Sequence, residues 1–133
     1  MSRVKELTNL AVQPSAKTLG HYRVKRAWIV EFDGRAFTVP ANFEFDGDSV
    51  PRWPLVYWIA KGRSGLKAPC LHDWLYIKQP VSRRQSDQAY LAMMKHTGVP
   101  LRWRVIHYLG VRIGGWVGWR RNAKRKAERK THG

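Results

Sequence analysis

Acidic residues are scarce in this chain, so the position of each one is informative. Of the five aspartates, four lie between positions 46 and 87. The run His72-Asp73-Trp74-Leu75-Tyr76 places His72 and Tyr76 four residues apart, on one face of a helix. If this helix packs antiparallel on the next one across the short connection at residues 79–82, Asp87 faces His72 or Tyr76. We therefore predict a His–Asp pair with a tyrosine beside it.

Such a pair can activate water. A carboxylate that holds one imidazole nitrogen fixes the tautomer and raises the basicity of the ring. Asp73, together with Asp46, Asp48 or loop carbonyls, could bind a hard cation such as calcium, which would polarise a carbonyl or phosphoryl oxygen. The candidate catalytic residues are thus His72, Asp87 and Tyr76, and the candidate metal ligands are Asp73, Asp46 and Asp48.

A structural interpretation of the same residues stays open. His72 could be a hydrogen-bonded core histidine, and Asp87 could pair with a buried arginine. The run Asp46-Gly47-Asp48-Ser49 has the composition of Asx and Ser turns, which need no function.

A β-hairpin and three helices are expected to position these residues. Residues 1–20 are polar and predict a mobile or surface-draped arm. Residues 22–32 and 35–39 are rich in β-branched and aromatic residues and flank Asp33-Gly34, a strong hairpin turn signal. Residues 41–54 predict a shaped loop, residues 55–60 one or two helical turns, and residues 61–65 a basic turn.

The helices are expected over residues 68–78, 83–96 and 101–119. Ser82 and Gln85 form a capping-box signature for the second helix. The prediction is one α+β domain over residues 21–119, in which the hairpin packs on about three helices, followed by a basic tail over residues 120–133. The predicted core includes Trp28, Leu71, Leu75, Leu91, Ile106 and Leu109.

The third helix has an apolar stripe at positions 105, 106, 109, 113, 116 and 117. Gly110 and Gly114 permit close approach of another backbone. The stripe predicts either a core helix packed on the hairpin or an interfacial helix with Trp103, Trp116 and Trp119 as membrane anchors. The tail can bind any polyanion through its seven bases: Arg120, Arg121, Lys124, Arg125, Lys126, Arg129 and Lys130.

Composition limits the class of protein. The 133 residues carry 25 Lys and Arg against nine Asp and Glu, a net charge of +16 that suits a polyanionic partner such as nucleic acid or an anionic membrane. The single cysteine excludes an intrachain disulfide framework. The first residues lack a signal-peptide pattern, and no apolar run is long enough for an ordinary transmembrane helix. We expect synthesis in a cytoplasm without secretion by a signal peptide.

Several short motifs occur in an order that resembles domain-of-unknown-function family 1353. They are Phe45-Asp46-x-x-Ser49-Val50-Pro51, the His72–Tyr76 run, Arg83-x-x-x-Asp87, Met93-Met94, Gly98-Val99 and the segment with Tyr108, Gly110 and Arg112. The resemblance implies an origin in tailed bacteriophages or prophages, with synthesis in the host cytoplasm, and implies no particular activity.

A second, local resemblance links His72-Asp73-x-x-Tyr76 and the later Asp87 to the active site of phospholipase A2. It implies His72 as the water-activating base, Asp73 as a calcium ligand, Asp87 as the orienting acid and Tyr76 as its support. The chain departs from that family because it has no disulfide framework and no recognisable Gly-rich calcium loop.

Three functions are consistent with the sequence. The first is a small metal-assisted hydrolase acting on a lipid or cell-envelope ester. The second is a virion component, such as a head or tail accessory protein, with other virion proteins as partners and a structural His–Asp group. The third is a non-specific nucleic-acid-binding protein.

Overall fold

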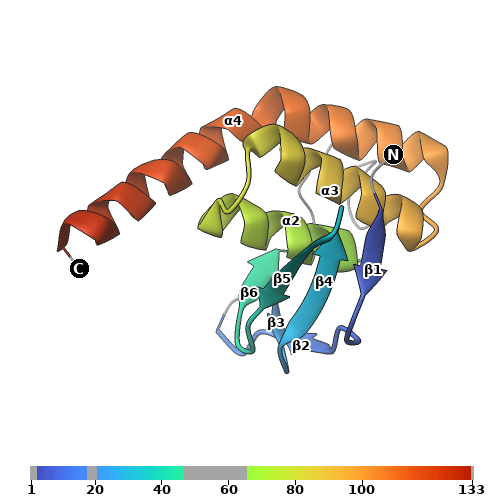
Figure 1. Cartoon of the computed structure of the whole chain (residues 1–133), viewed down its shortest axis with the longest axis horizontal. Helices are drawn as coiled ribbons and strands as arrows, with labels where there is room; N and C mark the ends of the chain where they lie inside the picture. Colours follow the sequence, from blue (N-terminus) through green and yellow to red (C-terminus); the bar gives the residue numbers. More distant parts are fainter. Residues whose placement is uncertain (1–2, 18–20, 47–65, 133) are drawn as a thin grey trace.

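The computed structural model describes residues 3–17, 21–46 and 66–132. These ranges contain two small antiparallel sheets and three helices, an α+β architecture in agreement with the prediction (Figure 1). The strands are β1 (Val4–Glu6), β2 (Val12–Pro14), β3 (His21–Val24), β4 (Trp28–Phe32), β5 (Arg35–Val39) and β6 (Glu44–Asp46). The helices are α2 (Lys67–Lys78), α3 (Arg83–His96) and α4 (Leu101–His132).

The predicted hairpin is present as β4 and β5. Asp33 and Gly34 both have positive φ, 50° and 82°, as a type I′ turn requires. Trp28 pairs with Val39 at one end and Phe32 with Arg35 at the other. The predicted first strand over residues 22–32 is divided, however, because the exposed residues 25–27 separate β3 from β4. The strand order is β1-β4-β5 in one sheet and β2-β3-β6 in the other.

Within the arm expected over residues 1–20 to be mobile or surface-draped, residues 3–17 contain the strands β1 and β2. β1 pairs with β4, and β2 pairs with β3. Glu6 accepts hydrogen bonds from Trp28 Nε1 at 3.2 Å and Lys67 Nζ at 2.9 Å. These contacts attach β1 to the hairpin and to the start of α2.

Helices α2 and α3 begin and end within one residue of the predicted bounds. Ser82 Oγ accepts from the Gln85 backbone N–H, and Gln85 Oε1 accepts from the Ser82 N–H, so the capping box is formed. Gln79, in the left-handed conformation, ends α2. Figure 1 shows these two helices between the strands and α4. The expected turns over residues 55–60 and 61–65 lie outside the described residues.

The core lies mainly between the strands and the α2–α3 pair. Of the predicted core residues, Trp28, Leu71 and Leu75 are fully buried, and Leu91 and Ile106 are partly buried. Leu109 is 51% exposed, so its assignment to the core was wrong. The reason is the orientation of α4, whose other face packs on α2 and α3.

Helix α4 continues to His132, past the predicted end near residue 119, so residues 120–132 of the expected tail continue this helix. Its buried positions are His107, Gly110 and Val111, whereas most of the apolar stripe is exposed. The glycines let the backbone of α4 approach its neighbours, and the large apolar side chains therefore face outward. The core alternative for this stripe was wrong. No helix within the described ranges has an apolar stretch long enough to cross a membrane.

Candidate active site

Asp87 is the centre of a buried hydrogen-bond network. Its Oδ1 atom lies 2.8 Å from His72 Nε2 and accepts a hydrogen bond from the Tyr76 hydroxyl at 2.6 Å. Its Oδ2 atom accepts a hydrogen bond from Arg112 Nη1 at 2.7 Å, and Arg83 Nη1 lies 3.9 Å away. The side chain of Asp87 is completely buried. One carboxylate therefore joins side chains from all three helices.

The antiparallel packing of α2 on α3 creates this arrangement. His72 and Tyr76 occupy successive turns of one face of α2, and their ring centroids are 4.1 Å apart. The short connection after Gln79 returns the chain, so that Asp87 in the second turn of α3 lies opposite both rings. The distances agree with the convergence of His72, Tyr76 and Asp87 predicted from their spacing.

The network sets the charge of each group. Burial favours a higher pKa for Asp87, but hydrogen bonds from His72, Tyr76 and Arg112 outweigh it and hold the pKa below the ordinary value. Burial lowers the pKa of His72 in spite of the opposing hydrogen bond and charge of Asp87. The pair at neutral pH is thus a carboxylate and a neutral imidazole. Because a carboxylate accepts, the proton of this hydrogen bond lies on Nε2.

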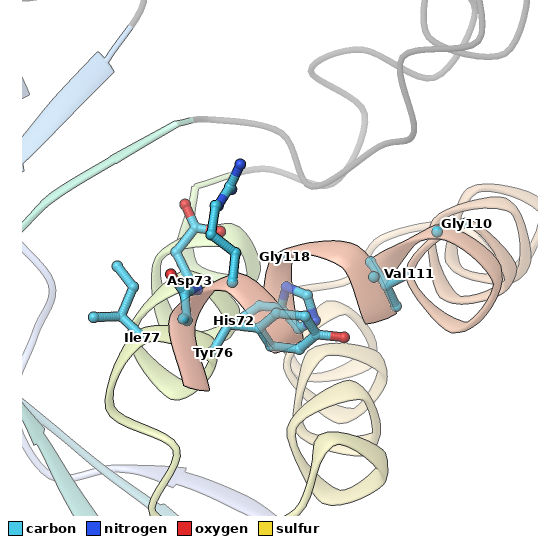
Figure 2. Close-up of a pocket in the computed structure, with 11 residues that line it drawn as sticks. His72, Asp73, Tyr76, Ile77, Gly110, Val111 and Gly118 are labelled. Carbon is cyan, nitrogen blue, oxygen red and sulfur yellow. The ribbon is translucent and has the colours of Figure 1, made fainter. Parts of the chain in front are cut away.

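His72 forms part of the wall of an open cavity of about 390 Å³. Figure 2 shows His72 and Tyr76 side by side next to α4, with Asp73 and Ile77 on the adjoining part of α2. The cavity is lined by His72, Asp73, Tyr76, Ile77, Gly110, Val111, Gly114, Gly115, Gly118, Arg121 and Asn122. Although His72 is only 3% exposed, its ring therefore adjoins a space large enough for a small ligand.

Glycines of α4 form the opposite wall. A Cβ atom at Gly115 would lie 2.5 Å from the Tyr76 hydroxyl oxygen and 3.3 Å from Arg83 Nη1. Arg83 also donates to the backbone carbonyls of Val111 and Arg112, each at 3.1 Å. Close approach was expected at Gly110 and Gly114, and these two residues line the cavity. Gly115 also approaches Tyr76 closely, which was not expected from the sequence.

Four further residues of the site were not predicted from the sequence. Arg112 and Arg83 bind or approach Asp87, and the ring of Tyr90 lies 4.6 Å from that of His72. The Tyr90 hydroxyl is 3.2 Å from Nδ1 of the buried His107. Arg83 could have been found, because it lies four residues before Asp87 on the same helix. Arg112 depends on how α4 packs, which no local pattern predicts.

The candidate metal ligands are placed only in part. Asp73 lines the cavity beside His72. Asp46 is the last residue of β6, which packs near α2, and Asp48 lies outside the described residues. Within the ranges that the structure describes, no group of three or more His, Cys, Asp or Glu side chains could hold a metal ion.

The predicted polyanion-binding residues lie in the last turns of α4. Arg120, Arg121, Lys124, Arg125 and Arg129 are exposed. Arg121 also lines the cavity, whereas Lys126 donates to the Lys78 carbonyl oxygen at 2.8 Å and so caps the end of α2. Lys130 is in the last turn of α4. The exposed bases make this end of the helix cationic.

Fold and site together define a small basic α+β protein with a buried His–Asp–Tyr network beside a cavity. The chain belongs to the family described as Protein of unknown function (DUF1353), whose family model matches residues 22–111. The match includes His72, Tyr76 and Asp87 and ends one residue before Arg112. No curated protein and no solved structure matches the chain.

Proposed function

We propose that this protein is a hydrolase in which His72 activates water for attack on an ester. The observation that carries the proposal is the hydrogen bond from Nε2 of His72 to the buried Asp87, in a ring that lines a cavity. A neutral imidazole with a fixed tautomer is the form of histidine that acts as a general base. The local resemblance to phospholipase A2 supports the same roles.

The reaction needs one proton to move twice. The neutral imidazole of His72 takes a proton from water, and the hydroxide attacks the ester carbonyl carbon. The tetrahedral intermediate collapses, and the imidazolium returns its proton to the leaving alkoxide. Asp87 stabilises the transient imidazolium through Nε2, while Tyr76 and Arg112 hold the carboxylate in place.

The cavity wall favours a lipid or cell-envelope ester. Ile77, Val111 and the glycines present apolar surface, and Arg121 adds a positive charge. An ester with an apolar chain and an acidic group fits this combination. Asp73 is the proposed ligand for a cation such as calcium, which when bound would polarise the substrate carbonyl.

Esterase assays test this proposal directly. The full chain is incubated with p-nitrophenyl esters of increasing acyl length and with anionic phospholipid, each with added calcium or with a chelator. We expect His72→Gln to lower kcat/KM by at least about a hundredfold, the usual contribution of a general base. His96→Gln is the matched control, because His96 binds Glu6 outside the cavity. Loss of turnover in the control, or full activity in folded His72→Gln, would contradict the proposal.

A virion component in which the network is structural is the second candidate. It is favoured by the complete burial of Asp87 and by the two arginines that its Oδ2 atom faces. In that case the wild-type chain hydrolyses no ester, with or without calcium. Asp87→Asn then lowers stability, and its functional defect is in assembly into particles. A phage setting, implied by the family resemblance, suits either candidate.

A further inference from the structure

An exposed apolar stripe follows the outer side of α4. Among the described residues, seven large hydrophobic side chains are exposed, and six of them belong to this helix. We name these six the outer stripe: Leu101, Val105, Leu109, Ile113, Trp116 and Val117. Their exposed fractions range from 44% at Val105 to 64% at Leu101. Five of them recur at intervals of four residues, so they lie along one side of the helix.

The outer stripe lies on a different face of α4 from the candidate active site. The cavity and core positions of this segment are His107, Gly110, Val111 and Gly114, which alternate with the stripe along the helix. Figure 1 shows α4 as the outermost helix, with α2 and α3 between it and the strands. A contiguous apolar surface of this length marks an interaction site.

Basic residues flank the outer stripe at both ends. Arg102 and Arg120 are exposed, and their guanidinium carbons lie 5.6 Å from the Trp103 ring and 5.8 Å from the Trp116 ring. The sequence of α4 contains ten Lys and Arg residues and a single acid, Glu128. An apolar face bordered by arginines and tryptophan is typical of helices that lie in a membrane interface.

The charge argues against a second copy of the chain as the occupant. Antiparallel packing of two stripes would bring Arg102 of one copy near Arg120 of the other. Parallel packing would bring each arginine near its own equivalent. Both orientations oppose like charges on chains of net charge +16, and α4 offers no acidic residue near the stripe to compensate. An anionic bilayer, in contrast, offers an apolar interior for the stripe and negative headgroups for the arginines. It also adapts to the surface of a single helix, so no matching protein surface is needed.

We propose that α4 lies flat on membranes containing anionic lipid and inserts the outer stripe, while the flanking arginines contact lipid phosphates. This inference is independent of the hydrolase, because the stripe and the cavity occupy different faces of α4. His72→Gln should therefore bind vesicles as the wild-type chain does, whatever its activity.

Vesicle co-sedimentation of the full chain tests the proposal. The vesicles contain either phosphatidylcholine alone or phosphatidylcholine with phosphatidylglycerol. We expect binding to the anionic vesicles, weakened at least about tenfold in Leu109→Gln/Ile113→Gln, because two inserted apolar side chains are removed. Leu7→Gln is the matched control, since Leu7 is 47% exposed and follows β1 in the strand layer. Circular dichroism and thermal unfolding check that each variant is folded.

Four results would overturn the proposal. The first is no binding to anionic vesicles at low salt. The second is equal binding by the stripe variant and the wild type, which would assign adsorption to charge alone. The third is a wild-type dimer that the stripe variant abolishes. The fourth is an acidic protein that competes with the vesicles for the stripe with higher affinity. Quenching of tryptophan fluorescence by brominated lipid adds a local readout, and Trp116→Phe should remove most of it.

Discussion

Asp87 is expected to make a large contribution to stability. Its carboxylate is fully buried. It balances the positive charges of Arg112 and Arg83 and accepts hydrogen bonds from His72 and Tyr76. Replacing one member of a buried ion pair leaves its partner uncompensated. We predict that Asp87→Asn lowers the free energy of unfolding by about 3 kcal/mol, measured by urea denaturation.

Asp33→Asn is the control for this substitution. Asp33 is exposed, accepts a hydrogen bond from the Arg3 backbone and has a positive φ that asparagine tolerates. Its free energy of unfolding should change by less than about 0.5 kcal/mol. A small effect at Asp87 as well would mean that the network is not a major source of stability.

The same network predicts how stability depends on pH. Because burial lowers the pKa of folded His72 below 6.5, the unfolded chain binds a proton first as the pH falls, and the folded state loses stability below about pH 6.5. The lowered pKa of Asp87 adds a further loss of stability at lower pH. This loss begins near pH 3.8, where the unfolded carboxyl takes up a proton, and continues as the pH falls through the pKa of the folded carboxyl. We predict that the free energy of unfolding decreases between about pH 7.5 and about pH 5, and that His72→Gln reduces this decrease.

An unchanged pH slope in folded His72→Gln would contradict this assignment. Titration of the His72 ring proton by NMR supplies an independent measurement, and its midpoint should lie below 6.5. The comparison of the two proteins cancels the contributions of the other histidines, including His96 at Glu6.

Part of this site could be predicted from the sequence. The interval between His72 and Tyr76 and the length of the connection to Asp87 are local quantities, and helix geometry converts them into positions in space. Arg112 lies 25 residues beyond Asp87, and its hydrogen bond to the carboxylate depends on the rotation of α4 about its axis. Tertiary packing sets that rotation, and the apolar pattern of α4 predicts the wrong face of the helix for the core.

At the scale of elements, the contact between α2 and α4 depends on glycine. The Cβ of Gly115→Ala would meet the Tyr76 hydroxyl at 2.5 Å, so either α4 or Tyr76 must move. We predict that Gly115→Ala destabilises the chain by about 1–3 kcal/mol, as overpacking does, and weakens the bond from Tyr76 to Asp87. Thermal unfolding measures the first effect and tyrosine pH titration the second.

Gly118→Ala is the matched variant on the same helix. A Cβ atom added at Gly118 would have no atom of the described residues within 4 Å, and its φ is not positive. Alanine is favoured over glycine in a helix by about 0.5–1 kcal/mol, so this variant should be neutral or slightly more stable. Equal destabilisation by both substitutions would show that the effect comes from the helix and not from Tyr76.

The elements themselves were predictable where the signal was local. Asp33-Gly34 determined the β4–β5 hairpin, and Ser82 with Gln85 determined the start of α3. β1 and β2 could not be found in the same way, because each has three residues and acquires its regular structure from pairing with β4 and β3. The face of α4 was misassigned because glycines lie inside and large apolar residues outside, the reverse of the usual pattern.

At the scale of the whole molecule, the outer stripe and the exposed bases near the C-terminal end of α4 occupy different parts of the helix. The outer stripe covers its first half, whereas the exposed bases Lys124, Arg125 and Arg129 lie beyond it. The two regions can therefore be changed independently. A nucleic-acid-binding protein would depend on the second region, because phosphate contacts require charge and no apolar insertion.

We predict that Lys124→Gln/Arg125→Gln/Arg129→Gln weakens binding to duplex DNA and lowers the slope of log affinity against log salt by up to about 3, since each phosphate that is no longer neutralised accounts for roughly 0.9. The substitutions spare Lys126, which caps α2, and Arg121, which lines the cavity, so the fold should be retained. Leu109→Gln/Ile113→Gln should leave DNA binding unchanged while it reduces vesicle binding. Fluorescence anisotropy at two salt concentrations measures the slope. If the charge variant and the stripe variant weaken binding to DNA and binding to vesicles equally, α4 acts as one cationic surface. The distinction between its two halves would then have no functional meaning.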